Sequence, residues 1–137
     1  MAIDDSRTPG EDGIAGRVLN VDDELSLATL LQKLLRAQGY RVAIAADGAA
    51  ALASIPDDPP DVILLDVVMP GMDGPATLLA LRATESAAET PVVFLTAKTQ
   101  PDEIARYREL GAAGVIPKPF DPMTLAALIR EFYERAG

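Results

Sequence analysis

Short apolar runs alternate along the chain with segments in which apolar residues recur at helical spacing. Strand-like runs lie at residues 17–23, 40–46, 61–66, 91–97 and 114–120. The intervening segments predict helices over residues 24–39, 47–55, 74–84 and 101–111, with a last helix from residue 121. Because the connections are short and crossovers are right-handed, the pattern predicts an α/β fold with an open, doubly wound, five-stranded parallel sheet.

Residues that begin and end helices stand at the ends of these segments. Gly39 and Gly111 follow the first and fourth helical segments, where a left-handed residue ends a helix. Pro75 suits the first turn of the third helix, since its missing N–H would have no partner there. Asp121 and Pro122 are a cap and a first helical residue for the last helix.

The third and fifth strand-like runs differ in what they predict. "VILLD" ends at Asp66 and is apolar without alternation, which is typical of a central parallel strand buried on both faces. "GVIPKPF" contains Pro117, which donates no ladder hydrogen bond. We therefore expect the fifth strand at an edge of the sheet.

Length and composition indicate one domain. The chain has 137 residues, of which 49% are hydrophobic, and it has no cysteine. Residues 1–15 are acidic and contain glycine, so we expect a flexible tail there and a folded domain over residues 16–137. No apolar run approaches the roughly 20 residues that span a bilayer. We expect a soluble, cytoplasmic protein that does not associate with membranes.

The charged residues exclude some functions. A formal net charge of −9 opposes binding to nucleic acid, which requires clustered Lys and Arg. The chain has no histidine, so any phosphohistidine chemistry must come from a partner.

Polar residues gather where the predicted strands end. Asp22 and Asp23 end the first run, Asp66 the third and Thr96 the fourth, and Lys118 lies in the fifth. Ligands of open parallel sheets bind at this edge. Each residue alone also has an ordinary explanation: the acids could cap a helix, Thr96 could favour a strand, and Lys118 could be a solvated charge.

Taken together, these residues indicate a phosphoryl-transfer site. Three acids in one cleft raise one another's pKa unless a cation lies between them. Oxygen ligands without His or Cys select a hard ion, and few protein ligands favour Mg²⁺ over Ca²⁺. Asp66 could then attack a phosphoryl group and form an aspartyl phosphate, with Lys118 neutralising charge and Thr96 donating a hydrogen bond.

Four motifs resemble the receiver domains of two-component response regulators, including the single-domain, chemotaxis-regulator-like ones. They are "VDDE", "LLDVVMPGMDG", "FLTA" and "PKPF", in the family's order and with similar spacing. The resemblance covers residues 17–135. It implies a flavodoxin-like (βα)5 fold with strand order 2-1-3-4-5.

The resemblance also implies roles for the strand-end residues. Asp66 is the expected phospho-acceptor, Thr96 the switch hydroxyl, and Lys118 the partner of the phosphoryl group. The expected Mg²⁺ ligands are Asp22, Asp23, Asp66 and the backbone carbonyl of Val68.

One position departs from the family. Receivers often carry an aromatic residue three positions before the lysine, where its ring turns inward as the threonine moves, and this chain has Val115 there. The family's output face consists of the fourth helix, the fifth strand and the last helix. Tyr107 and Tyr133 are candidate contacts on that face, although both also fit half-buried amphipathic side chains.

The leading hypothesis is a phospho-accepting switch that is not a turnover enzyme. A sensor histidine kinase or histidine phosphotransfer protein would donate the phosphoryl group, and the product would bind a target protein as a monomer or a phosphorylation-dependent dimer. An aspartyl-phosphate phosphohydrolase would need a second acid where Val68 stands. A phosphorylation-independent scaffold is disfavoured because the chain has the polar residue expected for phosphoryl transfer at all five strand-end positions. These residues are Asp22, Asp23, Asp66, Thr96 and Lys118. A dinucleotide-binding fold is excluded because no Gly-rich fingerprint follows the first strand.

Overall fold

The computed structural model describes residues 16–56, 59–69, 71–118 and 120–136. The flexible tail predicted for residues 1–15 lies outside the described residues. The side chains at the end of the last helix, including Tyr133, lie outside them too.

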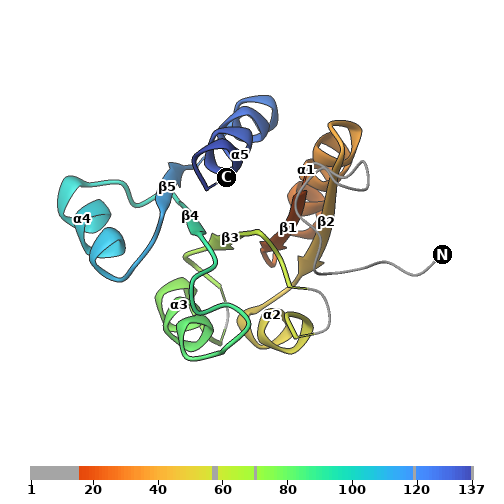
Figure 1. The fold of residues 1–137 in the computed structure, drawn as a ribbon. Coiled ribbons are helices and arrows are strands. Elements are labelled where there is room, and N and C mark those ends of the chain that lie inside the picture. Colours follow the sequence, from red (N-terminus) through yellow and green to blue (C-terminus); the bar gives the residue numbers. More distant parts are fainter. Residues whose placement is uncertain (1–15, 57–58, 70, 119, 137) are drawn as a thin grey trace.

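Five strands and five helices alternate along the described chain (Figure 1). The strands are β1 (Gly16–Val21), β2 (Tyr40–Ala45), β3 (Val62–Asp66), β4 (Val92–Thr96) and β5 (Gly114–Pro117). The helices are α1 (Leu25–Ala37), α2 (Gly48–Ser54), α3 (Gly74–Arg82), α4 (Pro101–Glu109) and α5 (Pro122–Ala136). All neighbouring strands are parallel and the sheet order is β2-β1-β3-β4-β5, which confirms the predicted fold.

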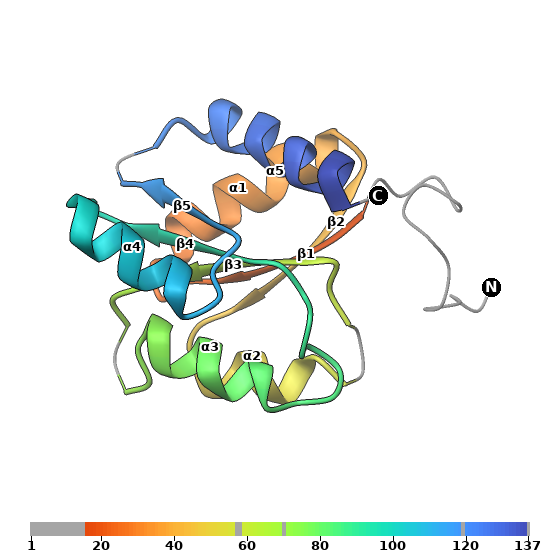
Figure 2. The same cartoon turned by 60° about the vertical axis from the view of Figure 1, so that its left-hand side comes forward.

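Helices cover both faces of the sheet. Figure 2 shows α1 and α5 above the strands and α2 and α3 below them, with α4 beside β5. Leu31 of α1 and Ile129 of α5 belong to one buried cluster, whereas Leu78 of α3 and Tyr107 of α4 belong to the other. The sheet therefore separates two apolar cores.

Strand β3 is the centre of this arrangement. All five of its residues are buried, with Ile63 and Leu65 in one core and Leu64 in the other. This confirms the prediction from the unbroken apolar run. Burial on both faces makes the strand a rigid mount for Asp66, its last residue.

The helix ends follow the sequence signals. Asp121 Oδ1 accepts a hydrogen bond of 2.9 Å from the Met123 N–H, and Asp73 Oδ1 accepts one of 2.9 Å from the Ala76 N–H. Gly39 and Gly111 have φ angles of 95° and 107°, in the left-handed region that glycine adopts without strain. Within the described ranges, none of the helices has the length and hydrophobicity that a transmembrane segment requires.

Several strands end before the apolar runs do, most clearly β1 and β5. β1 ends at Val21, because the Asp22 side chain accepts a hydrogen bond from the Glu24 N–H and the chain turns there. β5 ends at Pro117 and lies at the sheet edge, as predicted. Both differences leave a polar residue, Asp22 or Lys118, just beyond the strand.

Candidate functional site

Parallel strands bring the predicted polar residues to one edge of the sheet. β1, β3, β4 and β5 run in the same direction, so their carboxyl ends lie together. Asp66 and Thr96 are the last residues of β3 and β4, and Asp22 and Lys118 directly follow β1 and β5. The expected convergence therefore occurs.

Asp66 is held by the backbone around it. The carboxylate is buried, and its Oδ1 accepts a hydrogen bond of 3.3 Å from the Val68 N–H. Helix α3 begins against the same segment, since the Gly74 N–H donates a bond of 2.9 Å to the Val67 carbonyl. A Cβ on Gly74 would lie 2.9 Å from the Asp66 carbonyl oxygen and 2.7 Å from Val67 Cα. Glycine thus permits the close approach of α3 to the strand end.

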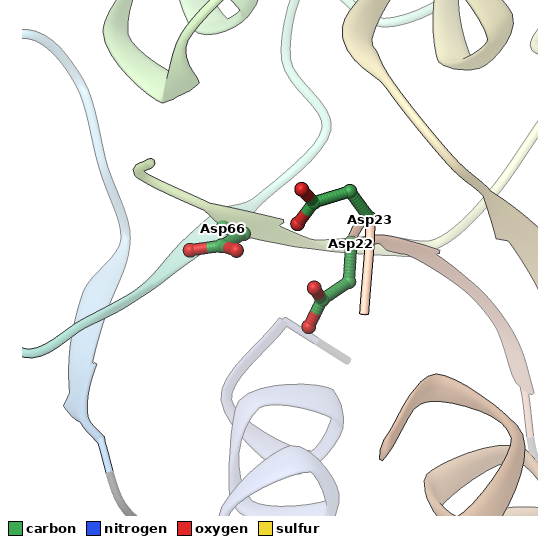
Figure 3. A group of neighbouring side chains, drawn as sticks. All are labelled: Asp22, Asp23 and Asp66. Carbon is green, nitrogen blue, oxygen red and sulfur yellow. The ribbon is translucent and has the colours of Figure 1, made fainter. Parts of the chain in front are cut away.

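Three carboxylates gather at this edge. One oxygen from each of Asp22, Asp23 and Asp66 lies within 4.8 Å of the others. Figure 3 shows the three side chains grouped at the ends of β1 and β3. Asp22 and Asp66 are buried, whereas Asp23 is exposed. A hard divalent cation fits this oxygen-only set, which is open on the Asp23 side.

The environment of the Asp22 carboxyl shifts its pKa. Burial raises the pKa of its carboxyl above the usual 3.8, and the charges of Asp66 and Asp23 raise it further. The Glu24 N–H, which donates to Oδ1 at 2.9 Å, and the Lys118 ammonium oppose this rise in pKa. The carboxylate is therefore only partly compensated and favours an additional cation.

Lys118 connects two of the acids. Its Nζ lies 3.2 Å from Asp66 Oδ2 and 3.8 Å from Asp22 Oδ2. The side chain is 22% exposed, so Lys118 is an ion-paired residue and the solvated-charge explanation is wrong. Its backbone N–H donates a hydrogen bond of 2.8 Å to the Thr96 carbonyl, which ties the end of β5 to β4.

Thr96 is buried, and its hydroxyl is already engaged. Thr96 Oγ1 accepts a hydrogen bond of 2.9 Å from the Lys98 N–H in the loop that follows β4. The hydroxyl proton remains available for a second partner, since a hydroxyl both donates and accepts.

The structure leaves the predicted role of the Val68 carbonyl untested and rules out the capping explanation for Asp22 and Asp23. Val68 is 63% exposed in the loop after Asp66, and the role of its carbonyl as a metal ligand stays a prediction. The helix-capping explanation for Asp22 and Asp23 is wrong, because α1 has Glu24 at its N-cap and no side-chain capping bond.

The sequence did not reveal how the Tyr107 side chain packs. Tyr107 was a candidate surface contact, but it is only 6% exposed. Its ring lies edge-on to Phe94, with the ring centroids 5.1 Å apart and an interplanar angle of 80°. The sequence did contain a signal for this burial. Helix α4 is mostly polar, and Tyr107 lies three positions after Ile104, the spacing that places two apolar side chains on the same helix face.

Comparison with known proteins relates the chain to one family. The sequence model of the family described as "Response regulator receiver domain" matches residues 18–130. "DNA-binding response regulator MtrA" of Mycobacterium tuberculosis is 40% identical over 119 residues, which are 87% of this chain and 51% of that protein. "Transcriptional regulatory protein CpxR" of Escherichia coli is 42% identical over 120 residues, or 88% of this chain and 50% of that protein. The chain spans about half the length of the curated relatives it matches.

Solved structures have the same fold. Chemotaxis protein CheY4 of Vibrio cholerae superposes with a TM-score of 0.80 at 37% identity, covering 85% of this chain and 97% of that one. The receiver domain of sensor histidine kinase PA1611 from Pseudomonas aeruginosa has a TM-score of 0.76 at 28% identity, covering 87% and 98%. The PA1611 structure is described with a magnesium ion coordinated in its active-site cleft.

Proposed function

Because this chain belongs to the family of response regulator receiver domains, we propose that Asp66 accepts a phosphoryl group from a phosphohistidine of a partner protein. The observation that carries the proposal is the Asp66 carboxylate at the end of a fully buried strand, 3.2 Å from the Lys118 ammonium. Receiver domains act with histidine kinases in two-component signalling, and this chain has no histidine of its own. The donor is therefore a sensor histidine kinase or a histidine phosphotransfer protein.

The transfer is a displacement at phosphorus. A carboxylate oxygen of Asp66 bonds to phosphorus while the phosphorus–nitrogen bond of the donor breaks, and the donor imidazole keeps the electron pair and takes up a proton. Lys118 stays beside the transferring oxygens, since its Nζ already contacts Asp66 Oδ2 at 3.2 Å. The Thr96 hydroxyl turns to donate a hydrogen bond to one of them.

The acid cluster fits a magnesium site. The ligands we propose are Asp22, Asp23, Asp66 and the backbone carbonyl of Val68. When bound, Mg²⁺ would neutralise negative charge on the transferring phosphoryl oxygens. The raised pKa of Asp22 and the mutual repulsion of the three acids support a cation at this position.

The phosphorylated domain acts as a switch and not as a turnover enzyme. A phosphoryl group adds about −1.5 to −2 charges, which must favour one of two conformations for a signal to pass. A phosphohydrolase would need an acid–base residue where Val68 stands, exposed and apolar. Without such a residue, we expect the aspartyl phosphate to hydrolyse slowly.

The output surface we propose comprises α4, β5 and α5, which lie together at one edge of the sheet (Figure 1). A target protein, or a second copy of the chain after phosphorylation, would bind there. The receiver domain is taken as residues 16–137, following a tail at 1–15, and it acts in the cytoplasm. The relatives named as DNA-binding are about twice as long, so that activity is not assigned to this acidic chain.

Mass measurement after incubation with a small phosphodonor and Mg²⁺ tests the acceptor. The wild type gains one phosphoryl mass, Asp66→Asn gains none, and Asp73→Asn gains it like the wild type. Asp73 is a matched control because it lies in the same loop region and Asn also caps α3. Equal labelling of Asp66→Asn and wild type would refute the assignment, and rapid multiple turnover of a phosphate ester would favour the phosphohydrolase.

The scaffold alternative needs a binding measurement. Target proteins are captured with the unmodified protein and with the protein carrying Mg²⁺ and beryllofluoride, a phosphoryl mimic. A switch retains different partners in the two states, whereas a phosphorylation-independent scaffold retains the same ones.

A further inference from the structure

An aromatic pair joins α4 to the strand that carries Thr96. The Tyr107 ring meets Phe94 of β4 edge-on, with the centroids 5.1 Å apart, and both side chains are buried. This geometry places the positive edge of one ring against the negative face of the other, so the contact has a preferred orientation. A rotation of either ring therefore disturbs the other.

Phe94 and Thr96 project from the same face of the sheet. Side chains alternate along a strand, and these two residues are two positions apart in β4. Phe94 packs in the same core as Tyr107, whereas Leu95 packs in the opposite core. Tyr107 is thus linked through Phe94 to the strand end at the phosphorylation site.

Tyr107 also lines a hollow. The hollow has a volume of about 360 Å³ and is bordered by the loop after Asp66, the loop after Thr96 and helix α4. Its lining includes Val68, Lys98, Arg106 and Tyr107. Because the interior of a protein is otherwise close-packed, the hollow offers the ring a second position.

The Lys98 backbone connects this hollow to Thr96. Its N–H donates a hydrogen bond of 2.9 Å to Thr96 Oγ1. If the Thr96 hydroxyl turns toward a phosphoryl group on Asp66, this bond is lost and residues 97–100, all exposed, are released. Helix α4 begins at Pro101, directly after that segment.

The residue of β5 next to Phe94 is the aliphatic Val115 and not an aromatic residue. Val115 pairs with Phe94 in the sheet register and packs against the same core. An aliphatic side chain lacks the oriented edge-to-face contact that Phe94 makes with Tyr107.

We propose that Tyr107 is the positioning residue that couples Thr96 to helix α4. When the Thr96 hydroxyl turns to the phosphoryl group, residues 97–100 shift and the Tyr107 ring moves away from Phe94 and further into the hollow, displacing α4. The inference rests on the proposed phosphorylation of Asp66 and assigns the coupling to a residue of α4 in place of β5.

Fluorine NMR observes the ring directly. The three tyrosines are labelled with 3-fluorotyrosine, and Tyr→Phe substitutions at Tyr40, Tyr107 and Tyr133 assign the signals. Phosphorylation with a small phosphodonor and Mg²⁺ is followed by mass on the same sample. The Tyr107 signal shifts on phosphorylation, while that of Tyr40, in β2 at the far edge of the sheet, stays in place.

Amide hydrogen exchange over residues 101–109 then tests coupling in variants. Tyr107→Leu loses the phosphorylation-dependent change in exchange but still takes up phosphate, and Tyr107→Phe, which retains the ring, keeps the change. Leu110→Ala is the matched control, since Leu110 follows α4 and packs against the same core without contributing a ring. It keeps the change although it weakens packing.

Three outcomes would overturn the inference. A phosphorylated wild type with an unmoved Tyr107 signal removes the coupling and leaves the proposed function intact. A normal exchange response in Tyr107→Leu does the same. A wild type that takes up no phosphate removes the proposed function and the inference with it. The fluorine measurement needs no core substitution, so it decides the question even where Tyr107→Leu does not fold.

Discussion

Lys118 Nζ lies 3.2 Å from Asp66 Oδ2 and 3.8 Å from Asp22 Oδ2, so one ammonium serves two buried carboxylates. In the absence of metal this lysine compensates much of the negative charge at the sheet edge. The ammonium also occupies space next to the proposed magnesium ligands. Lys118 should therefore stabilise the metal-free protein and compete with the cation.

Replacing Lys118 with methionine separates these two effects. Lys118→Met should lower the free energy of unfolding of the metal-free protein by about 1–3 kcal/mol, because two buried carboxylates lose a charged partner. It should bind Mg²⁺ more tightly, by at least about 1 kcal/mol of removed charge repulsion. Phosphoryl uptake should fall all the same, since the ammonium no longer neutralises the transferring oxygens.

Urea unfolding with and without Mg²⁺, and titration calorimetry, measure these quantities. Lys33→Met, an exposed lysine on α1, is the control for loss of one positive charge. Weaker Mg²⁺ binding by Lys118→Met than by wild type would contradict the competition.

Asp22 predicts a pH dependence of stability. Its folded pKa is raised above the usual 3.8, chiefly by burial. Both states are protonated at low pH, and as the pH rises the unfolded chain ionises first. Unfolding is therefore increasingly favoured until the pH passes the folded pKa.

The variant Asp22→Asn lacks this ionisation, and its amide oxygen can still accept from the Glu24 N–H. Its stability advantage over wild type should be smallest in acid, grow as the pH rises and then level off. Denaturant unfolding across this range measures the difference. Saturating Mg²⁺ should reduce the advantage at neutral pH by stabilising the wild-type carboxylate. A difference that is constant with pH would show that Asp22 does not titrate as inferred.

Thr96 should matter for signalling more than for folding. Thr96→Val keeps the shape but removes the acceptor for the Lys98 N–H, which should cost about 1 kcal/mol. The variant should still take up phosphate on Asp66 but lose the exchange response over residues 101–109. Thr96→Ser, which keeps the hydroxyl, should retain that response. Equal responses in Val and Ser variants would rule out a role for the hydroxyl.

Gly74 tests the close approach of α3 to the site. An added Cβ would lie 2.7 Å from Val67 Cα and 2.9 Å from the Asp66 carbonyl oxygen, both backbone atoms. Gly74→Ala should therefore destabilise the fold by about 1–3 kcal/mol and slow phosphoryl uptake by displacing Asp66. Thermal unfolding and the rate of mass increase measure the two effects.

Gly71→Ala is the matched control for Gly74. Gly71 has a φ angle of 76° and open space around its Cβ position, so alanine there adds backbone strain of about 1–2 kcal/mol and no contact with the site. It should lose stability but keep the phosphoryl uptake rate. A rate equally reduced in both variants would indicate that general destabilisation, and not the displacement of Asp66, is responsible.

Much of the fold could be predicted because it depends on local patterns. The unbroken run before Asp66 predicted a strand buried on both faces, and Pro117 placed the last strand at an edge. Once parallel strands alternate with helices, their carboxyl ends must meet. The convergence of Asp22, Asp66 and Lys118 follows from that topology alone.

Tertiary packing decided what the patterns left open. The sequence treats Asp22 and Asp23 as equivalent neighbours, yet one is buried and the other exposed, because successive residues at a strand end point in different directions. Tyr107 was a candidate surface contact or a half-buried side chain, but it is buried and packs on Phe94, since the contact depends on how α4 lies against β4. Residue order thus determined which groups meet at the edge. The distances, the burial and the partners of each ring came from long-range packing, which no local pattern encodes.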